Sequence, residues 1–165
     1  MKQTGSTSDF TTAEEELPGA PLIGALLRMP GVTVRDRILA RLHEHGYADL
    51  EPAHLTVFQY PGPQGLRPTD LAARLRMSKQ ALNYLLGELE RLGYVERRPD
   101  TKDRRGKRVT LTARGVATIA VIRQAVDEVE ADWAKQLGAT RFAQLRTLLV
   151  ELNAMTDSPS DRPGS

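Results

Sequence analysis

Basic side chains are concentrated between Arg97 and Arg108, a stretch that holds seven basic and two acidic residues. The wider segment from Gly65 to Gly115 carries 13 Lys and Arg against 6 Asp and Glu, a net charge of +7, whereas the rest of the chain carries 10 against 15, or −5. A local excess of this kind is typical of a surface that contacts phosphates, and a solvated loop is the alternative. The near-neutral total of +2 therefore conceals a candidate polyanion-binding segment.

A second group of polar residues lies on one face of a predicted helix that begins after Ser78 and ends at Gly93. Leucines at helical spacing predict its buried stripe, namely Leu82, Leu85, Leu86, Leu89 and Leu92. The opposite face carries Gln80, Asn83, Tyr84, Gly87 and Arg91. Gln and Asn amides can pair bidentately with adenine, and Ser78 with the free N–H groups of the first turn favours phosphate oxygens. Gly87 indicates either a close approach of the backbone to a ligand or a tolerated weak position in the helix.

These two groups need a scaffold of helices and one hairpin. A short helix is expected from an N-cap at Thr69 to Leu75, followed by a turn at Arg76-Met77. Alternating residues at 94–98 and 107–111 predict a two-stranded hairpin. Thr112 is expected to cap a long helix to about Leu137, whose apolar markers are Val116, Ile119, Val126, Val129 and Trp133. A last helix is expected over about 140–154, with Phe142, Leu145, Leu149 and Leu152 as its stripe.

The N-terminal half is less regular. Apolar residues keep helical spacing from Leu22 to Leu42, but Pro30-Gly31 is expected to break or kink any single helix there. Another helix is predicted from Pro52 to about Tyr60. Residues 1–19 and 156–165 have the composition of disordered tails. We therefore expect one domain over 20–155, with an outer pair of helical segments at about 21–46 and 113–154 around a central unit at about 50–112.

Composition excludes several classes of protein. The 165 residues contain no cysteine, which removes disulfides, thiol chemistry and Cys-ligated metals. His43, His45 and His54 lack the spacing of metal ligands, so no metal site is expected. No nucleophile, phosphate-loop or metalloprotease motif is present, and we expect neither an enzyme nor a cofactor. The chain lacks a signal peptide and an apolar run long enough to cross a bilayer, so we expect a cytoplasmic location with no membrane partner.

Together, the short helix with its turn, the polar-faced helix and the basic hairpin resemble the MarR family of winged helix-turn-helix transcription regulators. The resemblance covers about residues 21–155. It is carried weakly by Thr69–Leu75 and Ser78–Val95. It is carried strongly by the hairpin pattern Asp103-x-Arg105-x-x-x-Val109-x-Leu111-Thr112-x-x-Gly115. The resemblance implies a mainly α (α+β) winged-helix fold with N- and C-terminal dimerisation helices.

The resemblance further implies a homodimer that binds a palindromic operator in double-stranded DNA as a repressor. A small phenolic or lipophilic effector would release it. The helix after Ser78 would enter the major groove, Arg105 would enter the minor groove and Asp103 would hold its guanidinium. Arg104, Lys107 and Arg108 would contact phosphates. The expected DNA contacts are Ser78, Lys79, Gln80, Asn83, Tyr84, Asp103, Arg104, Arg105, Lys107 and Arg108. Glu88, Glu90 and Glu96 would repel phosphate, which favours contact by the N-terminal half of that helix alone.

An effector pocket is expected where the first helices, the long helix and the winged unit meet, since ligand sites favour such junctions. Its candidate lining residues are Tyr47, His54, Phe58, Tyr60 and Trp133, each of which is also an ordinary core residue type. Two other functions remain open. The winged helix could contact an acidic protein partner, or it could bind DNA without a ligand and without sequence preference.

Overall fold

The computed structural model describes residues 21–58, 65–100 and 106–156. Its helices are α1 (Ile23–Glu44), α2 (Leu55–Phe58), α3 (Pro68–Leu75), α4 (Lys79–Arg91), α5 (Ala113–Leu137) and α6 (Ala139–Thr156). The strands β1 (Val95–Pro99) and β2 (Lys107–Leu111) form one antiparallel sheet, in register from Val95 opposite Leu111 to Pro99 opposite Lys107. The expected mainly α fold with one small hairpin is confirmed.

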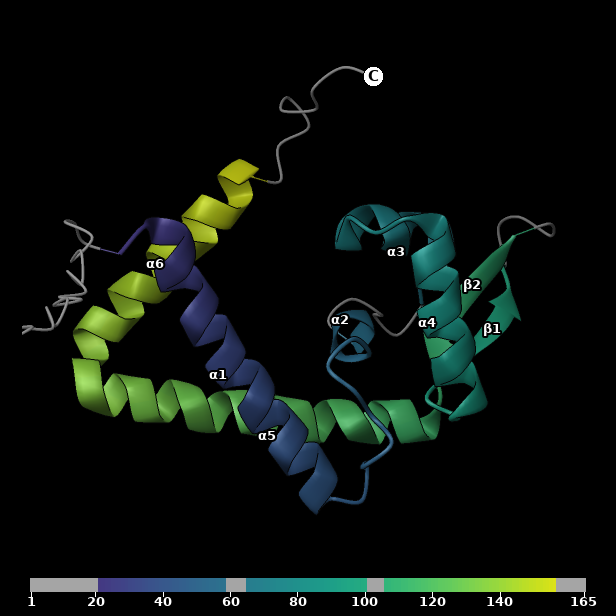
Figure 1. The fold of residues 1–165 in the computed structure, drawn as a ribbon, viewed down its shortest axis with the longest axis horizontal. Helices are drawn as coiled ribbons and strands as arrows, with labels where there is room; N and C mark the ends of the chain where they lie inside the picture. The colour runs from purple at the N-terminus through teal and green to yellow at the C-terminus, as the bar shows by residue number, and fades with distance from the viewer. Residues whose placement is uncertain (1–20, 59–64, 101–105, 157–165) are drawn as a thin grey trace, which may run out of the picture.

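The long helix α5 connects the two halves of the molecule. Figure 1 shows the winged unit of α3, α4 and the hairpin at one end of α5, and α6 folding back from its other end. Helix α1 crosses α5 and packs against it. Between α5 and α6 the chain turns at Gly138, whose φ of 86° lies in the region that side chains disfavour.

The hydrophobic core lies under the winged unit. Its fully buried members come from α1 to α5, the segment after α1 and the hairpin, and include Leu42, Leu50, Leu71, Leu86 and Val109. By contrast, α6 contains no buried residue, and residues 21–31 of α1 are all exposed. The outer part of the helical half therefore presents apolar side chains that this single chain leaves uncovered.

The structure differs from the local predictions at three places in the helices. Helix α1 runs continuously through Pro30, so of the expected break or kink the break is absent. Residues 21–31 are exposed, so water can solvate the carbonyl that the missing N–H of proline leaves free. Helix α3 begins at Pro68 with Arg67 as its N-cap, whereas the Thr69 hydroxyl donates to the Asp70 side chain at 3.4 Å. Proline at the first helical position sets the start of the helix instead of threonine.

The predicted helix from Pro52 to Tyr60 is also wrong in length, because α2 contains only Leu55–Phe58. Residues 52–54 form turns that are closed by hydrogen bonds such as His54 N–H to the Glu51 carbonyl at 3.0 Å. Residues 59 and 60 lie outside the described residues.

The buried face of α5 differs in part from the predicted apolar stripe. The Thr112 cap and the end at Leu137 are confirmed, with Thr112 Oγ1 accepting the Gly115 N–H at 3.1 Å. Val116 is 58% exposed, and the buried positions are Gly115, Thr118, Ala125 and Val129. At Gly115 the helix lies so close to Tyr94 that a Cβ built on the glycine would lie 2.1 Å from the Tyr94 carbonyl oxygen.

Candidate nucleic-acid interface

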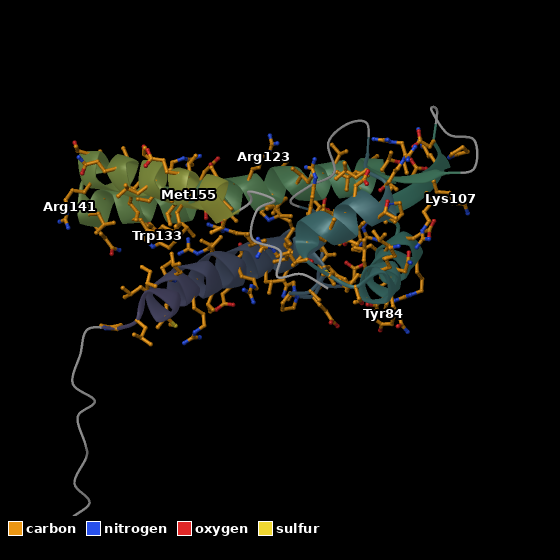
Figure 2. The ribbon with its side chains drawn as sticks, turned by 90° about the horizontal axis from the view of Figure 1, so that it is seen from above. Tyr84, Lys107, Arg123, Trp133, Arg141 and Met155 are labelled. Atoms are coloured by element: carbon orange, nitrogen blue, oxygen red, sulfur yellow. The ribbon has the colours of Figure 1, made fainter. Side chains whose placement is uncertain are left out.

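Helix α4 presents its N-terminus and one polar face to solvent. Ser78 caps the helix, and its Oγ accepts the Ala81 N–H at 3.1 Å, as predicted. Leu82, Leu85, Leu86 and Leu89 are buried beneath α4. Lys79, Gln80, Asn83 and Tyr84 are exposed, so the structure places these four predicted contact residues on the outer surface of one helix. Figure 2 shows Tyr84 at the outer edge of α4.

Gly87 lies on the same exposed face of α4. A Cβ built there would meet nothing within 4 Å, so no packing inside this chain requires a glycine. The end of the helix is set by Gly93, whose φ of 79° follows the cap residue Leu92.

A buried histidine contacts helix α4 from the side of the core. The sequence analysis did not predict this contact. His54 is 4% exposed, and its Nε2 lies 3.4 Å from Glu88 Oε2. Glu88 Oε1 in turn accepts the Tyr84 hydroxyl at 3.1 Å. His54 was predicted to line an effector pocket, and that role stays a prediction; the partners of its ring are Glu88 of α4 and the backbone N–H of Glu51. The sequence carries no signal for this contact because 34 residues separate His54 from Glu88.

All three acidic residues of the winged unit that would repel phosphate have partners. Glu90 pairs with Arg97 at 3.4 Å, and Glu96 pairs with Arg98 at 2.6 Å. Glu88 is engaged by His54 and Tyr84 as described above. These contacts reduce the repulsion that the carboxylates would exert on DNA laid along α4.

The wing residues fall into three groups. Asp103, Arg104 and Arg105 lie outside the described residues, so their predicted roles stay predictions. Lys107 is exposed at the start of β2 (Figure 2). Arg108 is half-buried: its Nη2 donates to the Gly65 carbonyl at 2.6 Å and its Nη1 lies 3.6 Å from Asp100 Oδ2. The observed Arg108 contacts join the wing to the rest of the winged unit.

Asp100, which the sequence prediction did not single out, organises the base of the wing. Its side chain is only 1% exposed and accepts a hydrogen bond from Arg67 Nε at 2.7 Å. Its backbone N–H donates to the Gly106 carbonyl at 2.9 Å, which closes the hairpin on the other side. The buried carboxylate thus joins the segment before α3 to both strands of the wing.

A second polar cluster joins the winged unit to the helical half. The fully buried Tyr94 donates its hydroxyl hydrogen to Asp49 Oδ1 at 2.5 Å. Arg114 lies 4.3 Å above the Tyr94 ring, donates to Asp49 Oδ2 at 2.9 Å and donates to the Leu92 carbonyl at 2.9 Å. Burial and the hydrogen bond to Asp49 raise the pKa of Tyr94 well above its usual range. Partial burial opposes ionisation of Asp49, but the Tyr94 hydroxyl and the Arg114 charge outweigh it and lower the Asp49 pKa.

Among the described effector candidates, Tyr47 and Phe58 share one neighbour and Trp133 has another. Tyr47 and Phe58 pack on the Tyr94 ring, with centroid distances of 6.2 and 5.8 Å. Trp133 lies near the other end of α5 and packs against Phe142 at 6.4 Å. Tyr60 lies outside the described residues. The expected pocket at the junction of the helical segments therefore stays a prediction.

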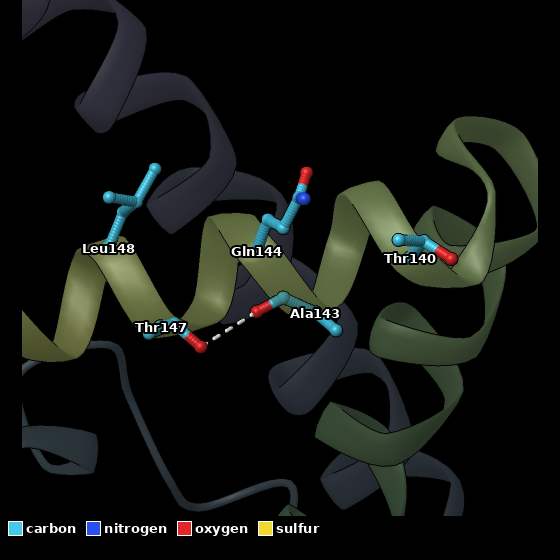
Figure 3. Close-up of a pocket in the computed structure, with 5 residues that line it drawn as sticks. All are labelled: Thr140, Ala143, Gln144, Thr147 and Leu148. Atoms are coloured by element: carbon cyan, nitrogen blue, oxygen red, sulfur yellow. Dashed lines mark hydrogen bonds between the residues drawn. The ribbon is translucent and has the colours of Figure 1, made fainter.

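Open hollows formed by described residues occur elsewhere. One, of about 560 Å³, runs beside α4 and is lined by Ala53, Met77, Ser78, Gln80, Ala81, Tyr84 and Leu85. Another, of about 670 Å³, lies along α6 and is lined by Thr140, Ala143, Gln144, Thr147 and Leu148 (Figure 3). Neither is lined by the five predicted effector residues.

Within ranges 21–58, 65–100 and 106–156, no group of three or more His, Cys, Asp or Glu side chains is placed to hold a metal ion. None of the helices in these ranges has the length and apolar character needed to cross a bilayer.

The capped α4, the turn before it and the antiparallel hairpin after it define a winged helix-turn-helix protein. Residues 48–106 match the model of the MarR family. The apo structure of wild-type MarR from E. coli superposes with a TM-score of 0.64 at 26% identity, covering 82% of this chain and 98% of that one. The chain is thus similar to MarR-family regulators in residues 48–106 and in its overall fold.

Two further proteins extend the comparison. The transcriptional activatory protein BadR from Rhodopseudomonas palustris is 36% identical over 106 residues, which are 59% of this chain and 59% of BadR. The match thus spans about three fifths of that relative. The structure of CouR from Rhodococcus jostii RHA1 bound to p-coumaroyl-CoA has a TM-score of 0.63 at 25% identity, covering 79% of this chain and 90% of CouR. The characterised relatives are regulators of transcription and not enzymes.

Proposed function

We propose that this protein is a sequence-specific regulator that binds double-stranded DNA as a homodimer. The observation that carries the proposal is the exposed polar face of α4, where a capped N-terminus is followed by Gln80 and Asn83 over a buried leucine stripe. An α-helix fits the major groove, and amides at these positions can reach base edges. Ser78, Lys79 and Tyr84 complete this set.

The wing supplies the second contact. Arg105 would enter the minor groove and Asp103 would orient it, while Arg104 and Lys107 would contact phosphates. The net charge of +7 between Gly65 and Gly115 supports this assignment. Arg108 takes part as a support of the wing, given its contacts with Gly65 and Asp100.

Exposed apolar residues on the outer helices support the homodimer. They comprise Leu22, Ile23, Leu26, Leu27 and Met29 on or beside α1, and Leu145, Leu148, Val150, Leu152 and Met155 on α6. An apolar surface of this extent is typical of a subunit interface. A second copy would cover it and place two copies of α4 against the two halves of a palindromic operator.

We further propose that the bound protein represses transcription and that a small phenolic or lipophilic effector releases it. The p-coumaroyl-CoA bound to CouR supports an aromatic effector for this chain as well. Because the partner is DNA, the protein would act in the cytoplasm. Expression of the controlled gene should rise when this protein is deleted. A fall in expression would instead indicate an activator, which is what the name of BadR says of that relative.

Gel-shift titration against DNA upstream of its own gene tests DNA binding. Asn83→Ala and Arg105→Ala should each weaken binding by about 1–3 kcal/mol without unfolding the protein. Affinity should also fall steeply with salt because bound phosphates release counterions. Unchanged affinity in both variants would refute the assigned contacts. Absence of a salt-sensitive shift would favour a protein-interaction module, and equal affinity for random DNA would favour a binder without sequence preference.

A further inference from the structure

Tyr84 stands out on the exposed face of α4 because its only hydroxyl hydrogen already has an acceptor. Tyr84 is 67% exposed, yet its hydroxyl donates to Glu88 Oε1, one turn further along the helix, at 3.1 Å. The same hydrogen bond raises the pKa of Tyr84 above its ordinary value, since Glu88 disfavours a second negative charge beside it. The phenol therefore keeps its proton.

Glu88 is itself held from the buried side. The Glu51 backbone N–H donates to His54 Nδ1 at 3.0 Å, so that nitrogen must act as an acceptor. The remaining hydrogen of a neutral imidazole then resides on Nε2, which faces Glu88 Oε2 at 3.4 Å. With His54 only 4% exposed, the position of this ring is fixed by the fold.

The direction of each hydrogen bond follows from these donors and acceptors. A carboxylate can only accept, so both His54 Nε2–H and the Tyr84 hydroxyl must donate to Glu88. A phenol has one hydrogen and acceptor lone pairs on the same oxygen. With its hydrogen directed at Glu88, the Tyr84 oxygen offers only acceptor capacity to a molecule that approaches the exposed face of α4.

We propose that Tyr84 is a specificity-determining residue that accepts a hydrogen bond from an exocyclic amino group of a base. This inference rests on the proposed function, because it places α4 in the major groove of DNA. There, adenine N6 and cytosine N4 present amino donors, whereas thymine O4 and guanine O6 present acceptors. Tyr84 therefore selects an amino-bearing base at one position of each half-site and discriminates against a keto-bearing base.

The first experiment uses the full-length chain and a duplex that it selects from a random-sequence pool. Single adenines are replaced by purine and single cytosines by 2-pyrimidinone, each of which lacks the amino group. One position should weaken wild-type binding by about threefold to tenfold, the size expected for one neutral hydrogen bond. The identity of that position distinguishes adenine from cytosine. Tyr84→Phe should show the same loss on the intact duplex and no further loss on the substituted one.

The second experiment frees the hydroxyl hydrogen. In Glu88→Ala the Tyr84 hydroxyl can donate, so a keto-bearing base should become acceptable at the same position. Glu90→Ala is the matched control, since Glu90 is an exposed acid of α4 that pairs with Arg97 and not with Tyr84. Glu90→Ala should change affinity uniformly and leave the base preference intact.

The outcomes separate this inference from the proposed function. If no duplex is selected from the pool, the proposed function fails and this inference fails with it. If a duplex is selected but Tyr84→Phe binds it like the wild type, or stays sensitive to loss of the amino group, only this inference is refuted. An unchanged base preference in Glu88→Ala likewise refutes it.

Discussion

The Nε of Arg67 donates to the buried carboxylate of Asp100 at 2.7 Å, although 33 residues separate the two in the sequence. Arg67 directly precedes α3, and Asp100 directly follows β1. Because Arg108 of β2 also faces Asp100, one carboxylate connects the helix-turn-helix to both strands of the wing. The orientation of the wing relative to α4 therefore depends on an ion pair within the winged unit itself.

Asp100→Asn should destabilise the protein, since the amide cannot balance the two guanidinium groups. The arginines are partly solvated, so we expect a loss of about 1–3 kcal/mol in urea unfolding, below the full cost of a broken buried pair. Glu96→Gln is the control: its pair with Arg98 is largely exposed and should contribute no more than about 1 kcal/mol. Equal losses in both variants would contradict the role given to Asp100.

The cluster of Asp49, Tyr94 and Arg114 should make stability depend on pH at the acidic end. Because folding lowers the Asp49 pKa, the ionised carboxylate stabilises the fold above its unfolded pKa of about 3.9, and this contribution disappears as pH falls through the folded pKa. The wild type should exceed Asp49→Asn in unfolding free energy at neutral pH, and the gap should narrow on acidification. The test is urea unfolding of both proteins at neutral pH and at acidic pH. If the difference in unfolding free energy between them is the same at both pH values, Asp49 ionisation does not contribute to stability.

Gly87 and Gly115 should respond oppositely to alanine. Gly87→Ala should stabilise the protein by about 1 kcal/mol, because the site has open space and alanine has the better helix propensity. Gly115→Ala should destabilise it by about 1–3 kcal/mol, since the new methyl would overlap the Tyr94 carbonyl. Thermal unfolding measures the change in stability of each variant.

The same Gly87→Ala variant tests how near the backbone of α4 approaches DNA. If the glycine admits a close approach, the stabilised variant should bind the selected duplex roughly tenfold more weakly, equivalent to about 1.4 kcal/mol. Undiminished affinity would identify Gly87 as a tolerated weak position in the helix.

Leu148→Glu should disrupt the proposed homodimer. Leu148 is 61% exposed on α6, and an unpaired carboxylate buried between two copies would raise the dissociation constant at least roughly thirtyfold. Sedimentation velocity should then show a monomer. Arg123→Glu is the control, because Arg123 is an exposed, already charged residue of α5 and does not belong to the apolar set proposed for the interface. A wild-type protein that sediments as a monomer would refute the dimer.

Local signals in the sequence were sufficient for much of the fold. The Ser78 and Thr112 caps, the leucine stripe of α4 and the hairpin were predicted because each depends on neighbours within one or two turns. The start of α3 was misjudged because two competing local signals, Pro68 and Thr69, lie side by side. The exposed face of α4 was predicted for the same local reason, since burial of the leucines dictates which residues remain outside.

The polar contacts that hold α4 and the winged unit in place could not be predicted from patterns in the sequence. His54 with Glu88, Arg67 with Asp100 and Arg114 with Asp49 are separated by 34, 33 and 65 residues. Each pair forms because tertiary packing brings two elements together, and no local spacing encodes it. The packing of Tyr47 and Phe58 on Tyr94 is likewise a tertiary contact, and their role as effector contacts stays a prediction.

The isolated β-bridge between Leu66 and Val109 should protect the wing from aggregation. Leu66 donates its N–H to the Val109 carbonyl at 3.1 Å and accepts the Val109 N–H at 2.8 Å. These bonds occupy the outer edge of β2, where an unpaired strand would otherwise offer a template for aggregation with another chain. Gly65 makes this protection feasible, since a Cβ there would lie 2.3 Å from the Val109 carbonyl oxygen. One glycine thus allows the chain to cover the outer edge of β2 at Val109.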